Sequence, residues 1–66
     1  MLKVGKIYKH INCLDICFRI EFLQENDGGD FFLKGLWLNQ HYDMMPICED
    51  EIVVVKDKLN QWREIN

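Results

Sequence analysis

The residues best suited to chemistry in this chain are three cysteines and two histidines, Cys13, Cys17, Cys48, His10 and His41. Zinc prefers four tetrahedral Cys or His ligands, and Cys13, Cys17, His41 and Cys48 form the candidate set. Zinc knuckles usually begin with two cysteines separated by two residues and flanked by glycine, and neither feature is present. We therefore expect no metal and no other cofactor, with the thiols acting as small apolar side chains. A zinc-stabilised structural module is kept as an alternative.

A catalytic cysteine–histidine pair is the second chemical hypothesis. A nucleophilic thiolate needs a cationic neighbour or a helix N-terminus to lower its pKa. Cys48 is instead followed by Glu49 and Asp50, and neighbouring carboxylates raise the pKa of a thiol. A barrel built from so short a chain also has little room for a substrate cleft. The sequence therefore predicts that the protein is not an enzyme.

The segment Asp27-Gly28-Gly29-Asp30 contains residue types found in calcium loops. Such a loop needs five or six ligands and a closing bidentate Glu at its twelfth position. Counted from Glu25 or Asp27, the twelfth position is Leu36 or Leu38. The segment is therefore predicted to be a hairpin turn.

The elements that would position these side chains are strands. In Ile16–Phe22, apolar residues alternate strictly with Cys17, Arg19 and Glu21, which is typical of a strand with one face in a core. We expect Ile16, Phe18, Ile20 and Phe22 to share that face. The turn at 24–30 and the apolar run from Phe31 to Asn39 complete a β-hairpin, with a sharp bend at Gly35.

The remaining segments are also read as short strands. Residues 2–9 form the first, with a glycine bulge at Gly5. A long connection at 40–50 leads to a β-branched strand at 51–56. We expect a one-turn helix at 57–61 and a last strand at 62–65. The alternative is a longer helix, since Leu59, Trp62 and Ile65 recur every three residues.

Five short strands, a tight turn before the last strand and Trp62 near the end resemble the small Src-homology-3-like barrels, which include Tudor-like and ribosomal-type modules. The resemblance implies an all-β, five-stranded, small open barrel over residues 1–66 as one domain. The chain lacks the paired tyrosines and acidic loop of the peptide-binding members, so we do not expect it to bind their proline-rich ligands. In its brevity, acidity and lack of motifs it is also similar to accessory proteins of bacteriophages.

The strand at 31–39 is apolar on both faces, and one small core can accept only one of them. We expect Leu36 and Leu38 to enter the core and the other face to bind a partner. Adaptable methionines would extend that face into a recognition surface. The predicted partner-binding residues are Phe31, Leu33, Trp37, Tyr42, Met44 and Met45.

The charge of the chain is segregated. Eleven acidic residues against eight basic ones give a net charge of −3. The predicted acidic surface, which would orient a basic partner, consists of Glu25, Asp27, Asp30, Glu49, Asp50 and Glu51. A general nucleic-acid binder is usually basic, so nucleic acid is an unlikely partner. The alternative is a nucleic-acid-binding barrel, with Lys3, Lys6 and Lys9 as its footprint and Tyr8 as its stacking residue.

The sequence thus favours a non-catalytic module that binds a protein partner or a second copy of itself. The analogy with bacteriophage proteins suggests an inhibitor or modulator of a host protein. No apolar run approaches the ~20 residues that span a bilayer, and residues 1–10 do not read as a signal peptide. We therefore expect no membrane association and a cytoplasmic location.

Overall fold

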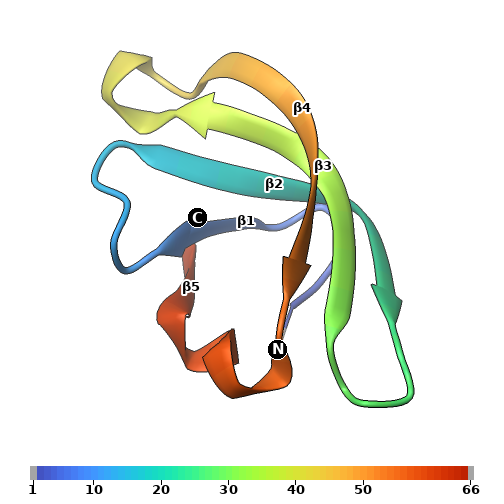
Figure 1. Ribbon diagram of the computed structural model, residues 1–66. Coiled ribbons are helices and arrows are strands. Elements are labelled where there is room, and N and C mark those ends of the chain that lie inside the picture. The colour runs from blue at the N-terminus through green and yellow to red at the C-terminus, as the bar shows by residue number, and fades with distance from the viewer. Residues whose placement is uncertain (1, 66) are drawn as a thin grey trace.

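The computed structural model describes residues 2–65 and consists of one antiparallel sheet with the strand order β4-β3-β2-β1-β5 (Figure 1). The strands are β1 (Ile7–His10), β2 (Ile16–Glu25), β3 (Phe31–Asn39), β4 (Met45–Val54) and β5 (Trp62–Ile65). Two short 3-10 helices connect them, η1 (Gln40–Tyr42) and η2 (Lys56–Gln61). The all-β class, the five strands and the helical turn followed by a last strand are confirmed.

The hairpin between β2 and β3 is closed by the predicted turn. The side chain of Asn26 accepts hydrogen bonds from the backbone N–H groups of Gly28, at 2.9 Å, and Asp30, at 3.0 Å. Gly29 has a φ of 86°, a conformation that residues with a Cβ rarely adopt. An asparagine cap and a left-handed glycine therefore explain why the chain reverses here.

A bulge divides β2 into two halves with opposite facing. The register with β3 shifts between Ile20 and Phe22. Before the shift, Phe18 and Ile20 lie in the core, 0% and 1% exposed. After it, Leu23 packs against the core and Phe22 is 44% exposed. The expectation that Phe22 shares the core face is wrong, because one inserted residue moves all later side chains to the other face.

Ile16, at the start of β2, lies on the same face as Phe18, as expected, but its side chain is 39% exposed and is not part of the main core. The neighbouring Cys17, expected nearer water, is fully buried. Its thiol lies 3.8 Å from the carbonyl oxygen of Leu38 and 3.5 Å from the sulfur of Met44. Leu38 is 3% exposed and belongs to this small cluster rather than to the main core. The β3–β4 connection therefore covers part of the outer face of the sheet.

The main core lies on the inner face of the curled sheet. Its buried members are Leu2, Tyr8, Phe18, Ile20, Phe31, Leu33 and Val54. Phe31 and Leu33 are only 6% and 1% exposed, so the face of β3 that we expected to meet a partner is the core face. Leu36, expected in the core, is half-buried on the other face. The two apolar rows of β3 could be separated only by knowing which way the sheet curls.

Strand β3 curves strongly along its length (Figure 1), and Gly35 lies in its middle. A Cβ at Gly35 would collide with the carbonyl oxygen of Arg19 and lie 2.8 Å from the ring of Phe18. Glycine is therefore required here because β2 approaches so closely. This agrees with the bend predicted at that position.

Two strands, β1 and β4, have bounds that differ from those expected. β1 begins at Ile7 because residues 4 and 5 form a turn, in which Gly5 has a φ of 86° and its N–H donates to the carbonyl of Ile20 at 2.7 Å. The glycine therefore supports a turn rather than a bulge. β4 begins at Met45, six residues earlier than expected, because backbone pairing with β3 continues through a segment with no alternation of apolar residues.

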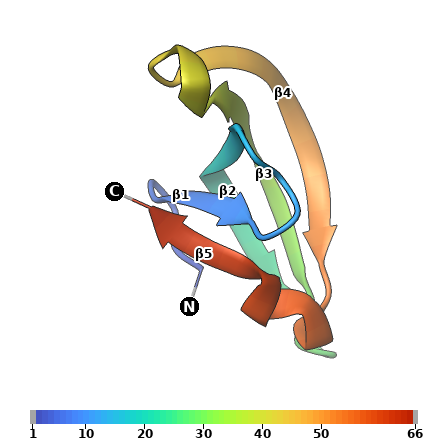
Figure 2. The same ribbon diagram turned by 90° about the vertical axis from the view of Figure 1, so that its left-hand side faces the viewer.

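Among residues 2–65, β4 and β5 are the two edges of the sheet, and no ladder joins them. The sheet curls so that β5 and the β3–β4 pair lie on different sides of the molecule (Figure 2). The side between these edges is called the open side below. No helix in this part of the chain is long and apolar enough to cross a bilayer.

Candidate functional site

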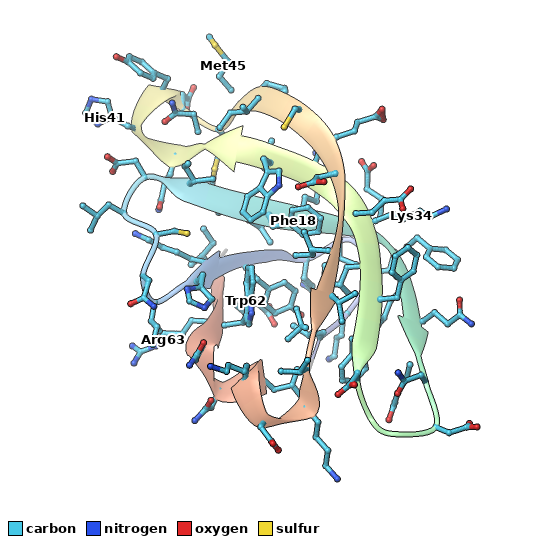
Figure 3. The ribbon with its side chains drawn as sticks, in the orientation of Figure 1. Phe18, Lys34, His41, Met45, Trp62 and Arg63 are labelled. Atoms are coloured by element: carbon cyan, nitrogen blue, oxygen red, sulfur yellow. The ribbon has the colours of Figure 1, made fainter. Side chains whose placement is uncertain are left out.

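Four rings meet at the open side and form what we call the aromatic cluster, His10, Phe18, Trp37 and Trp62 (Figure 3). Trp37 packs edge-to-face on Phe18, with ring centroids 4.8 Å apart. Trp62 lies 6.5 Å from Trp37 and 5.0 Å from His10. Phe18 is fully buried, whereas both tryptophans are half-buried. The cluster therefore joins the core to the surface.

The register of the strands brings these four residues together. Trp37 pairs with Phe18 across β3 and β2, and His10 pairs with Trp62 across β1 and β5. Paired residues in adjacent strands project to the same face of a sheet. Because the sheet curls, one face carries both pairs toward each other.

A carboxylate fixes the orientation of Trp37. Its indole N–H donates to Oδ2 of Asp50 at 2.9 Å, and the backbone N–H of Glu51 donates to Oδ1 of Asp50 at 2.8 Å. The hydrogen bond from Trp37, followed by that from Glu51, lowers the pKa of Asp50 below its usual value. Asp50 therefore places a fixed negative charge beside an aromatic ring.

His10 is held in a similar way on the other side of the cluster. Its Nε2 lies 3.0 Å from Oε1 of Gln61, and its Nδ1 accepts a hydrogen bond from the backbone N–H of Asn12 at 3.1 Å. With Nδ1 as acceptor, Nε2 is the donor to Gln61 in the neutral ring. Both ring nitrogens are thus engaged in orienting the imidazole against Trp62.

An apolar hollow of about 270 Å³ adjoins the aromatic cluster. It is lined by Cys13, Ile16, Trp37, Ile47 and Cys48. Ile16 and Ile47 are 39% and 49% exposed, and Cys48 is exposed as well. Exposed apolar side chains that gather around a tryptophan are typical of a surface that binds another molecule.

The middle of β4 is strongly acidic. Glu49, Asp50 and Glu51 are all exposed, and with Glu21 they line a second hollow of about 640 Å³. Lys34 also lines it, but its ammonium lies 5.5 Å from the ring centroid of Phe22 and 5.9 Å from that of Phe32. In residues 2–65 the only ion pair joins Arg19 and Glu21, at 3.1 Å. The three acids of β4 are therefore not neutralised by an ion pair.

The predicted partner-binding residues are divided by the structure. Phe31 and Leu33 are core residues, as described above, so their assignment to a partner face is wrong. Trp37 belongs to the aromatic cluster. Tyr42 and Met45 are 62% and 60% exposed at the β3–β4 connection, while Met44 is half-buried against Cys17. The predicted row is thus not a continuous patch.

The predicted acidic surface is divided into two parts. Glu25 and Asp27 line a hollow with Lys56 near the β2–β3 turn. Asp30 accepts a hydrogen bond from the backbone N–H of Lys56 at 2.9 Å, so it joins that turn to the start of η2. Glu25, Asp27 and Asp30 thus lie near the β2–β3 turn, whereas the acids of β4 lie at a sheet edge beside the aromatic cluster.

The candidate zinc ligands are not brought together. Cys17 is buried, and burial raises the pKa of its thiol. His41 stacks edge-to-face on Tyr42, with ring centroids 5.0 Å apart. Among residues 2–65, no three His, Cys, Asp or Glu side chains are grouped closely enough to hold a metal ion. Cys13 and Cys48 do line the same hollow.

The role of Tyr8 in the nucleic-acid alternative is contradicted. Its side chain is 3% exposed, and its hydroxyl oxygen accepts a hydrogen bond from the backbone N–H of Lys3 at 2.8 Å. A base cannot stack on a ring enclosed in the core. The lysines of that alternative would have to bind without it.

Sequence reasoning missed Trp62, His10 and Ile47 as members of the site. The pairing of β1 with β5 places the first two side by side. Ile47 is exposed because the register between β3 and β4 shifts beside it. Comparison with protein-family models, curated proteins and solved structures gave no match to this chain.

Proposed function

We propose that the chain is a non-catalytic protein-binding module, whose partner occupies the open side of the sheet. The observation that carries this proposal is the pair of half-buried tryptophans, Trp37 and Trp62, together with the apolar hollow beside Trp37 that residues 2–65 leave unfilled. Tryptophan is enriched among the residues that contribute most to binding at protein interfaces. Further burial of these rings is a favourable step that a partner can supply.

The orientation of Trp37 also supports recognition of a protein. Its hydrogen bond to Asp50 holds the ring in one position before a partner arrives. A side chain that is already ordered loses less conformational entropy on binding. Nearby, Ile47 and Cys48 offer an apolar surface next to exposed carboxylates. This combination suits a segment that is both apolar and basic.

Finer assignments belong to the same proposal. The strand order and the 3-10 turn before β5 support the resemblance to the small Src-homology-3-like open barrels. We place the protein in the cytoplasm, and the analogy with bacteriophage proteins suggests a host protein that is inhibited by occupation of its own binding surface. A fold shared by many functions does not by itself fix any of them.

The test compares two substitutions of exposed apolar residues. Ile47→Asp adds a charge to the hollow, whereas Leu14→Asp adds the same charge to a side chain that is 81% exposed on the β1–β2 loop. Both variants and the wild type are used to capture proteins from a bacterial lysate, with quantitative mass spectrometry, and thermal melts show whether each is folded. We expect Ile47→Asp to capture at least about tenfold less of one specific partner than Leu14→Asp does. Equal capture by all three proteins would contradict the proposal.

A further inference from the structure

We propose that the free edge of β4 receives an extended, basic segment of the partner, which adds to the sheet as a sixth strand. This inference rests on the proposed function and specifies the kind of partner. The strand from Met45 to Val54 pairs with β3 on one side only. The backbone groups on the other side of an edge strand can pair with an added strand.

The part of β4 that suits such pairing is Cys48–Val54. Its register with β3 is regular over these residues, from the pair Trp37–Cys48 to the pair Phe31–Val54. Before it, Ile47 lies at a register shift and Pro46 has no N–H to donate. An added strand would therefore pair with the second part of β4 and end near Ile47.

The added strand would lie over the open side. Asp50 and Cys48 pair with Gly35 and Trp37, which places them on the inner face, yet both are exposed. β4 is an edge strand, and no further strand among residues 2–65 lies beside these two residues. A strand next to β4 would cover them and direct its own inner side chains toward Trp37 and the apolar hollow.

The charges of β4 identify the added segment as basic. Glu49 and Glu51 lie on the outer face and Asp50 on the inner face, so an added strand meets carboxylates on both of its faces. Opposite charges in directly opposed positions of adjacent strands attract each other, and like charges repel. The segment should therefore carry Lys or Arg on both faces, with an apolar residue that reaches the hollow.

The hydrogen bonds of Asp50 connect strand pairing with the recognition of charge. Asp50 accepts the N–H of Glu51 as well as the indole N–H of Trp37. A strand that offers its own carbonyl oxygen to Glu51 leaves Oδ1 of Asp50 available for a cationic side chain. Strand pairing and charge recognition would thus support each other at one residue.

A second copy of the chain is disfavoured as the occupant by the same charges. Antiparallel pairing of two β4 strands about a two-fold axis at Asp50 would place Glu49 opposite Glu51 of the other copy. An axis at Glu51 would place the two Glu51 side chains opposite each other. Such positions have Cβ atoms about 4.5–5.5 Å apart, where like charges destabilise pairing.

The experiment uses three capped eight-residue peptides. The first has three consecutive basic residues, Lys or Arg, at its centre. Val alternates with Lys or Arg on either side of them. The second has the same sequence with N-methyl groups on alternate backbone amides, so it keeps the charge but cannot pair along one edge. The third carries Glu in place of every basic residue. Affinity is measured by calorimetry, and the site by amide chemical shifts and hydrogen exchange in NMR.

We expect the basic peptide to bind and to protect backbone amides within 48–54 from exchange. N-methylation should weaken binding at least about tenfold, and the acidic peptide should not bind. The double variant Glu49→Gln/Glu51→Gln should lose at least about tenfold in affinity for the basic peptide. Its matched control is Glu25→Gln/Asp27→Asn, which removes the same charge at the β2–β3 turn and should bind normally.

Equal binding of the N-methylated peptide would show attraction by charge alone and would overturn strand addition. Absence of binding by the basic peptide, or shifts confined to the β2–β3 turn, would overturn it as well. Sedimentation that shows a dimer, with residues 48–54 protected in the absence of peptide, would assign the edge to a second copy. In each case, a partner that Leu14→Asp and the wild type capture and Ile47→Asp does not would still support the open side as a protein-binding site.

Discussion

At the scale of single residues, the contact between Trp37 and Asp50 does the most to shape the site. The tryptophan is half-buried on Phe18, and its polar N–H is directed to the exposed carboxylate of β4. An indole N–H that loses water without gaining an acceptor is costly. Asp50 supplies that acceptor, so one exposed acid both orients the ring and retains its charge for a partner.

This contact predicts a dependence of stability on pH. Hydrogen bonds from Trp37 and Glu51 lower the pKa of Asp50 in the folded protein. A lowered pKa stabilises the folded state at every pH above the pKa of the unfolded chain, and the stabilisation is lost as the pH falls through the folded pKa. The wild type should melt at a higher temperature than Asp50→Asn at about pH 6, and the difference should shrink below about pH 3.

Asp50→Asn is a suitable comparison because its amide oxygen can still accept the hydrogen bond from Trp37, so mainly the charge is removed. Glu25→Gln, at an exposed position on the β2–β3 hairpin, is the control for the loss of one acidic charge. The two proteins are compared with the wild type by melts over a range of pH. A difference between wild type and Asp50→Asn that does not change with pH would mean that the ionised carboxylate does not stabilise the fold.

At the scale of elements, irregularities in the strands determine which residues face the core. The register shift between Ile20 and Phe22 reverses the facing of the side chains in the last part of β2. The shift beside Ile47 reverses the facing of those at the start of β4. Bulges also increase the local bend of a strand. Together with Gly35 they allow the long strands of the sheet to curl around one small core.

Two phenylalanines of β2 test this division by the same substitution. Phe18 is fully buried and Phe22 is 44% exposed on the other side of the bulge. Phe18→Ala should lower the free energy of unfolding by about 3–5 kcal/mol, which is enough to unfold a domain of this size. Phe22→Ala should cost less than about 1 kcal/mol, because the ring is largely exposed and lies against Phe32 and Lys34 at the surface.

Urea denaturation measured by tryptophan fluorescence gives the loss for Phe22→Ala, and it shows whether Phe18→Ala is destabilised or already unfolded without urea. Arg19→Ala, on the outer face between the two phenylalanines, should also be mild, since its ion pair with Glu21 is exposed. Similar losses for Phe18→Ala and Phe22→Ala would mean that β2 runs without a bulge and that all four apolar residues share one face.

The sequence allowed the elements to be predicted better than their facing. The alternation in β2, the hairpin turn at Asp27-Gly28-Gly29-Asp30 and the short turn before Trp62 are local signals, and the corresponding strands, hairpin and helical turn are present. The burial of Phe31 and Leu33 instead of Leu36 depends on the direction of curl, a property of the whole sheet. Likewise, Trp62 joins Trp37 only because β5 pairs with β1, more than fifty residues earlier in the chain.

At the scale of the whole molecule, a basic pair and an acidic run of three residues lie at opposite edges of the sheet. Lys9 and Arg63 are paired across β1 and β5 and line one hollow. The acids of β4 lie at the opposite edge of the sheet, on the side of Lys34 in Figure 3. With two such regions and a net charge of −3 for the chain, the surface formed by residues 2–65 does not favour a phosphate backbone.

This distribution predicts weak binding of nucleic acid. A twenty-nucleotide single-stranded DNA or RNA should show no measurable binding below about 10 μM at about 150 mM salt, because the acids of β4 repel phosphates and the buried ring of Tyr8 offers no stacking surface. Fluorescence anisotropy of a labelled oligonucleotide gives the measurement. Sub-micromolar binding that weakens steeply with salt and is lost in Lys3→Ala/Lys6→Ala/Lys9→Ala would instead favour a nucleic-acid-binding barrel. The variant Glu49→Gln/Glu51→Gln reduces the repulsion of phosphates without altering these lysines. Nucleic-acid binding that appears only in this variant would show that the acids of β4 prevent nucleic acid from binding and so favour a protein partner.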